Sequence, residues 1–355
     1  MWQTAVIVTL AVIAELVQLH QSKAQSQGIL QFRGGAKHPK SPVPSSIISQ
    51  KELEEYHRDG FILKKGLLQG EELSQLMEGA EEIYATSNQK DVNIPNFFQK
   101  LTFDLWRRKD EFAQLAFEDL PSVAAELLGF EQSSNKNSKE EDTIRILKDG
   151  FFGFQQKRNS GCGFHVDDAV FWPASDETTG VNFWVALSPM RILEGGGIRV
   201  VNQSKVEPIF EECRQAITTP SEHGYPRTCD MELVSPECHM KMLEASVVFD
   251  MEPGDALIWD RWTFHRSEPF RLTPEVDEAS EEECTDPSLE KTKDAGSDYR
   301  LRYTIRYVPG TAKASGRHHP SQATGETFDS PFYPQVWPSA VKSEIKSIQN
   351  GLDEQ

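Results

Sequence analysis

The sequence is poor in cysteine and has no paired-cysteine metal motif. Five cysteines occur among 355 residues, and no two of them are spaced as Cys-x-x-Cys. A structural zinc site therefore has no support in the sequence. Because the count is odd, at least one thiol has no intrachain partner. Cys229 and Cys238 either close a small loop, if the chain is exported, or are free thiols, and the sequence leaves both interpretations open.

Positive charge is also scarce. The chain has 37 Lys and Arg against 55 Asp and Glu, which gives a formal net charge of −18 and a pI near 5.0. Such a surface repels the phosphates of DNA and RNA. The composition therefore predicts that no nucleic acid is a partner.

The apolar run at the N-terminus is too short to span a membrane. Thr4–Ala14 has eleven residues and ends at Glu15, whereas a transmembrane helix needs about 20. The length fits the apolar region of a secretory signal, although no Lys or Arg precedes it. We expect residues 1–25 to be a signal peptide or anchor and 26–45 a linker; the alternative is an ordinary N-terminal helix. This expectation places the protein in the secretory pathway, with the cytoplasm as the alternative. It limits membrane contact to an uncleaved N-terminal segment.

Helix signals come first in the chain and strand signals follow. Ser49 to Glu52 has the Ser-x-x-Glu form of a capping box, residues 70–84 have apolar side chains at helical spacing, and 94–128 read as further helices. From residue 143, short runs rich in β-branched and aromatic residues predict strands. The order predicts a mainly β protein, a sandwich or barrel with N-terminal α-helices on its flank.

We place this domain at 46–340 and a C-terminal tail at 341–355. Two insertions interrupt its strands. One spans about 206–244 and holds three of the cysteines. The other, 272–298, has ten acidic residues against two lysines. Its composition predicts a solvated loop.

Two histidines and a carboxylate form a possible metal motif. His165 and Asp167 are separated by one residue, and His265 follows 98 residues later (265 − 167 = 98). Side chains two apart on a strand point to the same side of a sheet. Two histidines and one carboxylate on one face of a metal are the ligand set of non-haem Fe(II) oxygenases. A surface pair is the simpler interpretation of His-x-Asp alone.

The last predicted strand carries a basic face. Arg300, Arg302, Thr304 and Arg306 alternate with apolar and aromatic residues. An inward-pointing arginine needs a partner, and a dicarboxylate cosubstrate would supply one through a two-pronged contact. The alternative is a solvated face that pairs with the acidic insertion. Periodicity alone does not separate the two.

These blocks, in this order, resemble the phytanoyl-CoA dioxygenase family of Fe(II)/2-oxoglutarate oxygenases. The resemblance runs from roughly Ser49 to Pro338. It rests on LEEYHRDGFILKKGLLQGEELSQL, FHVDD, VNFWVALSPMRILEGGGIRVV, EPGDALIWDRWTFHRS and YRLRYTIRYVP. It implies a double-stranded β-helix, the cupin-like jelly roll, with N-terminal helices packed on one sheet.

The resemblance implies roles for individual residues. His165, Asp167 and His265 match the iron ligands, and Asp167 favours hydroxylation over halogenation. Arg300 matches the residue that holds the far carboxylate of 2-oxoglutarate, with Arg302 as its nearest rival. The match also assigns two residues to the cosubstrate pocket, Ser267 and Trp184.

The implied cofactors are Fe(II), 2-oxoglutarate and O2, with ascorbate as a possible addition. The implied reaction hydroxylates a C–H bond of a small organic or lipid/acyl substrate and releases succinate and CO2. The chain departs from the family in its acidic insertion and in Val201–Lys205, where many relatives have Pro-Gly-Ser-His. Two alternatives stay open: a jelly-roll module that binds metal or ligand without catalysis, and a zinc hydrolase built on the same three residues.

Overall fold

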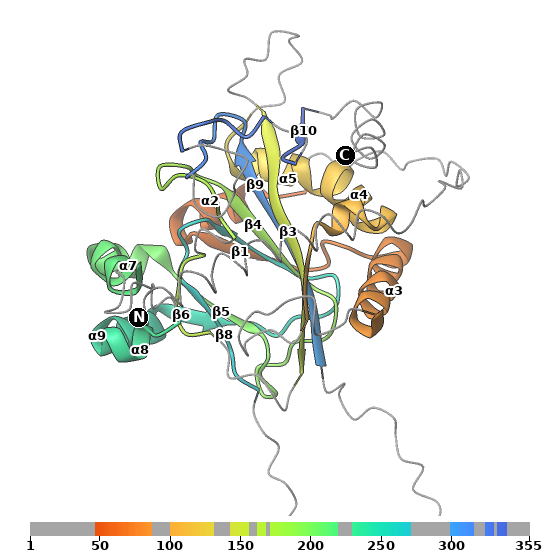
Figure 1. Cartoon of the computed structure of the whole chain (residues 1–355). Coiled ribbons are helices and arrows are strands. Elements are labelled where there is room, and N and C mark those ends of the chain that lie inside the picture. Colours follow the sequence, from red (N-terminus) through yellow and green to blue (C-terminus); the bar gives the residue numbers. More distant parts are fainter. Residues whose placement is uncertain are drawn as a thin grey trace, which may run out of the picture. The chain divides into compact units, whose positions relative to one another are not determined.

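Seven strands form the larger of two antiparallel sheets in the computed structural model (Figure 1). The structure describes residues 47–86, 100–130, 143–155, 162–167, 171–218, 229–270, 299–315, 324–329 and 332–338. In the larger sheet the strand order is β1 (Phe61–Lys64), β7 (Ala256–Asp260), β4 (Val181–Ala186), β9 (Tyr299–Pro309), β3 (Ile144–Gln155) and β10 (Gln335–Trp337), and β2 (Lys100–Phe103) also pairs with β3. The smaller sheet has the order β6 (Ser246–Val248), β5 (Ile198–Val201) and β8 (His265–Ser267). The two sheets give the mainly β, jelly-roll architecture that the sequence predicts.

Strand β9 shows how the sequence divides the larger sheet into two faces. Tyr303, Ile305 and Tyr307 are fully buried on one face. Tyr303 contacts Phe112 of helix α4 (Asp110–Gln114), with ring centroids 4.9 Å apart. The intervening residues lie on the opposite face, because side chains alternate along a strand. They include Arg302 and Arg306, each only 3% exposed. The predicted alternation is confirmed, and the alternative of a solvated basic face is wrong.

Helices from the N-terminal half cover the outer face. They are α2 (Gln50–Asp59), α3 (Gly70–Thr86), the short η1 (Leu105–Arg107), α4 (Asp110–Gln114), η2 (Leu115–Asp119) and α5 (Leu120–Leu127). The hydroxyl of Tyr307 donates to the carbonyl of Ala116 at 2.8 Å, which joins η2 to the sheet. The capping box at Ser49 is confirmed, because both of its hydrogen bonds are present. The expectation of helices throughout 94–128 is wrong at its start, where β2 pairs with β3.

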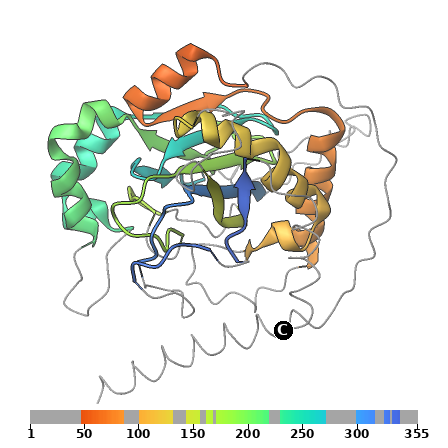
Figure 2. The ribbon, with the colours of Figure 1, turned by 90° about the horizontal axis from the view of Figure 1, so that it is seen from above.

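A helical insertion follows β5. It comprises α6 (Gln203–Val206), η5 (Glu207–Ile209), α7 (Phe210–Thr218), α8 (Met231–Val234) and α9 (Pro236–Ala245). Figure 2 shows α7 to α9 and α3 to α5 on opposite sides of the sheets. Val206, Ile217 and Met242 pack in one core cluster with residues outside the insertion, among them Phe164 and Phe264. The insertion is therefore packed against the body of the domain.

Disulfides tie the insertion together and to the sheet. Cys213 of α7 is bonded to Cys238 of α9, and Cys162 is bonded to Cys229. The predicted Cys229–Cys238 loop is wrong, and so is the alternative of free thiols at these two positions. Helix packing brings α7 beside α9, a proximity that sequence spacing does not reveal. Cys284 lies outside the described residues.

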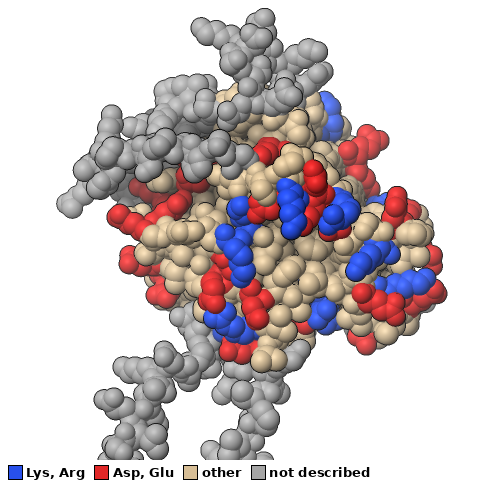
Figure 3. Space-filling view, turned by 180° about the vertical axis from the view of Figure 1, so that it is seen from behind, with Lys and Arg blue, Asp and Glu red and all other residues tan. Residues whose placement is uncertain are grey.

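Several predicted segments lie outside the described residues: the leader and linker, the acidic insertion 272–298 and the tail 341–355. Among the described helices, none has the length and apolar character needed to cross a membrane. Figure 3 shows basic and acidic side chains interspersed on one face. The described part of that face therefore carries charges of both signs and no patch of one sign alone.

Candidate metal centre

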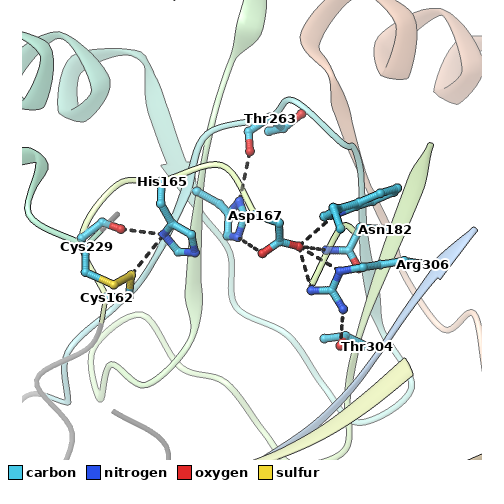
Figure 4. Close-up of polar contacts among 11 residues, drawn as sticks. Cys162, His165, Asp167, Asn182, Cys229, Thr263, Thr304 and Arg306 are labelled. Carbon is cyan, nitrogen blue, oxygen red and sulfur yellow. Dashed lines mark hydrogen bonds and ion pairs between the residues drawn. A yellow bond between two sulfur atoms is a disulfide. The ribbon is translucent and has the colours of Figure 1, made fainter. Parts of the chain in front are cut away.

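The fold brings His165, Asp167 and His265 together (Figure 4). One possible ligand atom from each lies within 4.8 Å of the others. The backbones of the two histidines exchange N–H···O hydrogen bonds of 2.9 Å in both directions. This exchange is an isolated bridge. His165 and Asp167 therefore do not lie on the continuous strand that their spacing suggested. His265 begins β8, because Asp260–Thr263 makes a turn between β7 and β8.

Each histidine directs one ring nitrogen into this group. The Nδ1 of His165 donates to the carbonyl of Gly163 at 2.7 Å, and the Nδ1 of His265 donates to the carbonyl of Thr263 at 3.0 Å. Such bonds fix the tautomer and the ring orientation, and they leave Nε2 available for a metal. Burial, together with the neighbouring His265, lowers the pKa of His165 to about 4. The His165 ring is therefore neutral at pH 7, as a metal ligand must be.

Asp167 is held by several donors on one oxygen. Its Oδ2 accepts from Arg306 Nε at 2.9 Å and Nη2 at 2.7 Å, and from Trp172 Nε1 at 3.1 Å. Asn182 Nδ2 lies 3.5 Å from the same oxygen. Burial alone would raise the pKa of Asp167, but the Arg306 guanidinium and His265 outweigh it and lower that pKa well below the usual value. The carboxylate is ionised, with Oδ1 facing His265 Nε2 at 3.5 Å.

This donor set fits a divalent transition metal. It offers two imidazole nitrogens and one carboxylate oxygen, with Asp167 and His265 buried and His165 half-buried. Three protein ligands on one side leave the remaining coordination positions of a metal open. Because Oδ2 is already occupied by donors, Oδ1 is the oxygen that Asp167 can offer.

The predicted cosubstrate residues lie along the same interior face. Arg300 is 5% exposed and forms an ion pair with the half-exposed Glu194. Arg302 lies with its guanidinium over Trp184, 5.2 Å from the ring centroid. Ser267 follows His265 by two residues on β8, so both side chains point to the same side. The structure thus brings Arg302 and Trp184 into contact, whereas Arg300 contacts Glu194 and Phe270.

Sequence reasoning missed the residues that hold Asp167. Arg306 was placed only on the basic face, and Trp172 and Asn182 received no role. The alternation along β9 contained part of the signal, because Arg306 shares a face with the expected cosubstrate arginine. Its pairing with Asp167 spans 139 residues of sequence and needs the fold.

The fold and the three ligand groups define a class, the 2-oxoglutarate-dependent non-haem iron oxygenases. The sequence profile of the phytanoyl-CoA dioxygenase (PhyH) family matches residues 56–271, which is more than half of the chain. The chain belongs to this family and is an enzyme of this class, with iron and 2-oxoglutarate as its cofactors.

Solved structures show the same fold at low sequence identity. The 2-oxoglutarate-dependent carbocyclase SnoK from nogalamycin biosynthesis is 16% identical with a TM-score of 0.59, and the match covers 84% of this chain and 100% of SnoK. The epimerase SnoN, solved with Fe3+, alpha ketoglutarate and nogalamycin RO, is 16% identical with a TM-score of 0.54, covering 81% and 98%. EctD from S. alaskensis, solved with 2-oxoglutarate and 5-hydroxyectoine, is 14% identical with a TM-score of 0.52, covering 82% and 88%. No curated protein sequence matches the chain.

Proposed function

We propose that this enzyme hydroxylates a C–H bond of a small organic or lipid/acyl substrate. The observation that carries the proposal is the close group of His165, Asp167 and His265, which we assign as the iron ligands. Iron with 2-oxoglutarate and dioxygen supplies the oxidising power, and 2-oxoglutarate leaves as succinate and CO2. Hydroxylation is the narrower part of the proposal, because the structural neighbours include a carbocyclase and an epimerase.

The protein's own contribution is to hold the reactants and exclude water. The two Nδ1–H bonds keep both imidazoles oriented with Nε2 toward the metal. The hydrogen-bond donors around Asp167 keep its Oδ2 turned away from the metal position. The interior arginines give the cosubstrate's far carboxylate a buried cationic partner.

Two arginines of β9, Arg300 and Arg302, are able to provide that cationic partner. The resemblance assigns the role to Arg300. Its ion pair with Glu194 supports the assignment, since a carboxylate from a loop already reaches the guanidinium. Arg302 is supported by its deeper burial and by its position over Trp184. We keep Arg300 as the proposed anchor, with Glu194 giving way to the cosubstrate.

The decisive experiment separates the oxygenase from its two alternatives. Protein purified without oxygen and supplied with Fe(II), 2-oxoglutarate and air should release succinate, with substrate-coupled turnover found by screening small organic and acyl compounds. Alanine at His165, Asp167 or His265 should remove most bound iron and abolish succinate release, because two remaining ligands hold iron poorly. Alanine at His57, which is exposed on α2, should change neither. Zinc as the bound metal would support the hydrolase, and metal binding without succinate would support the non-catalytic module.

We also propose that the protein works in the secretory pathway. The two disulfides support this location, because such bonds persist in oxidising compartments. The mass of the expressed protein and its resistance to added protease in intact microsomes test the proposal. A full-length product in the cytosol with reduced cysteines would contradict it.

A further inference from the structure

The Cys162–Cys229 disulfide lies directly beside the metal centre. Cys162 precedes His165 by three residues, and Cys229 lies just before α8 of the helical insertion. Figure 4 shows the sulfur of Cys162 facing the His165 ring, and Sγ lies 3.4 Å from Nδ1. One covalent bond therefore joins the insertion to the segment that carries two of the three proposed ligands.

Gly163 connects this disulfide to the orientation of His165. Its carbonyl is the acceptor for the His165 Nδ1–H, at 2.7 Å. A side chain at Gly163 would bring a Cβ to 2.4 Å from the carbonyl oxygen of Cys229. The backbones of Gly163 and Cys229 are thus in contact, and the disulfide one residue away fixes that contact. A change that moves Cys229 away therefore also frees the Gly163 carbonyl, which orients the His165 ring.

Two other attachments hold the same segment without the disulfide. The N–H of Ser267 donates to the carbonyl of Cys162 at 3.2 Å, and the backbones of His165 and His265 pair with each other. These bonds would keep the segment near β8 after loss of the disulfide, although with less restraint on Gly163. The expected effect is a weakened metal site rather than an unfolded one.

We propose that the Cys162–Cys229 disulfide positions His165 and makes metal binding depend on its redox state. The inference rests on the metal function proposed above. Cleavage by a tertiary phosphine breaks the S–S bond: phosphorus is oxidised to the phosphine oxide with the oxygen of water, and the two sulfurs become thiols with its protons. The ligands themselves are not altered by this step, so any change in metal affinity comes from their positioning.

The second disulfide provides a matched control. Cys213–Cys238 lies in the same insertion, but it joins α7 to α9, and its two cysteines pack in the core cluster that includes Phe164 and Val166 rather than beside the His165 ring. We would compare Cys229→Ser with Cys238→Ser by titrating each with Mn2+ and reading free Mn2+ by electron paramagnetic resonance. Loss of a group that orients a metal ligand typically weakens metal binding about 10- to 100-fold. We expect that loss for Cys229→Ser and less than about 2-fold for Cys238→Ser, since the backbone of Cys229, unlike that of Cys238, lies against Gly163, whose carbonyl orients His165.

Wild-type protein provides a test that does not depend on either variant folding. Partial reduction with the phosphine, followed by mass spectrometry of alkylated thiols, gives the reduced fraction of each disulfide. Mn2+ affinity should follow the reduced fraction of Cys162–Cys229 and be independent of Cys213–Cys238, while circular dichroism stays unchanged. Equal dependence on both bonds, or no dependence on the first, would overturn the inference. If fully oxidised wild type binds no Mn2+, the proposed metal function itself fails.

Discussion

Replacing Arg306 by Met should destabilise the protein far more without metal than with it. Arg306 is 3% exposed, and two of its guanidinium nitrogens donate to the buried Asp167. Removing one partner of a buried ion pair costs about 3–5 kcal/mol, because the other charge is left in a medium of low polarity. In metal-free protein that cost falls on Asp167, which keeps the Trp172 bond, the weaker Asn182 contact and His265 Nε2 at 3.5 Å from Oδ1.

A bound divalent cation changes the result. Oδ1 is the Asp167 oxygen that would hold such a cation, whose charge would replace the one that Arg306 supplied. If the cation recovers about 2 kcal/mol of the loss, the thermodynamic cycle requires the variant to bind metal about 30-fold more tightly than wild type. The substitution is therefore expected to lower the stability of the metal-free protein and to raise its metal affinity.

Urea unfolding followed by tryptophan fluorescence, in EDTA and in saturating Mn2+, measures both stabilities, and a direct Mn2+ titration closes the cycle. Arg199→Met is the control, because Arg199 is also partly buried in an ion pair, but its carboxylate partner is Glu268 rather than Asp167. This control variant should lose the same free energy of unfolding in EDTA as in saturating Mn2+. An Arg306→Met variant that loses as much stability with Mn2+ as without it would refute the coupling between this ion pair and the metal.

Three further predictions concern the cosubstrate, pH and the acidic insertion. Arg300→Leu should weaken 2-oxoglutarate binding roughly 30- to 5,000-fold, from a charged contact worth about 2–5 kcal/mol. Arg302→Leu should weaken it less; the charge-transfer band of anaerobic Fe(II) protein measures both, and the reverse order would move the anchor by two residues. Burial raises the pKa of Asp149 from 3.8 to about 7, so its contribution to stability is fully present below about pH 4 and is lost as pH rises to 7. Relative to Asp149→Asn, the stability of wild type should therefore fall by up to about 4 kcal/mol across this window, and a flat difference in urea midpoints would contradict the argument. Deleting 275–295 should leave iron binding and the melting temperature nearly unchanged, because the segment has few apolar residues for a core; a fall of several degrees would show that it packs.

Local patterns were sufficient to predict much of the fold. The Ser49 capping box, the helix over 70–84 and the two faces of β9 each follow from residues close together in the chain, and each is present. The predicted jelly roll and metal ligand group needed one long-range inference, that His265 meets His165. The order of the family's blocks supplied it.

The remaining errors arose from long-range pairing. Asp167 depends on Arg306, and Cys229 on Cys162, over separations of 139 and 67 residues. Sequence spacing favoured the near partner Cys238 instead. Nothing in the local sequence distinguishes an arginine that binds an Asp167 carboxylate from its neighbours Arg300 and Arg302 on the same face.

The two disulfides interleave along the chain, and this arrangement affects how the protein reaches its oxidised form. Cys213 lies inside the loop closed by Cys162 and Cys229, and its partner Cys238 lies outside it. In an unfolded chain, the frequency of contact falls roughly as the −3/2 power of separation. Cys229 and Cys238 (238 − 229 = 9) therefore meet about 20 times as often as the native pair 67 residues apart. The fastest bridge to form is a non-native one, and thiol–disulfide exchange must then resolve it. The yield of correctly paired enzyme will depend on the isomerase capacity of the compartment in which it folds.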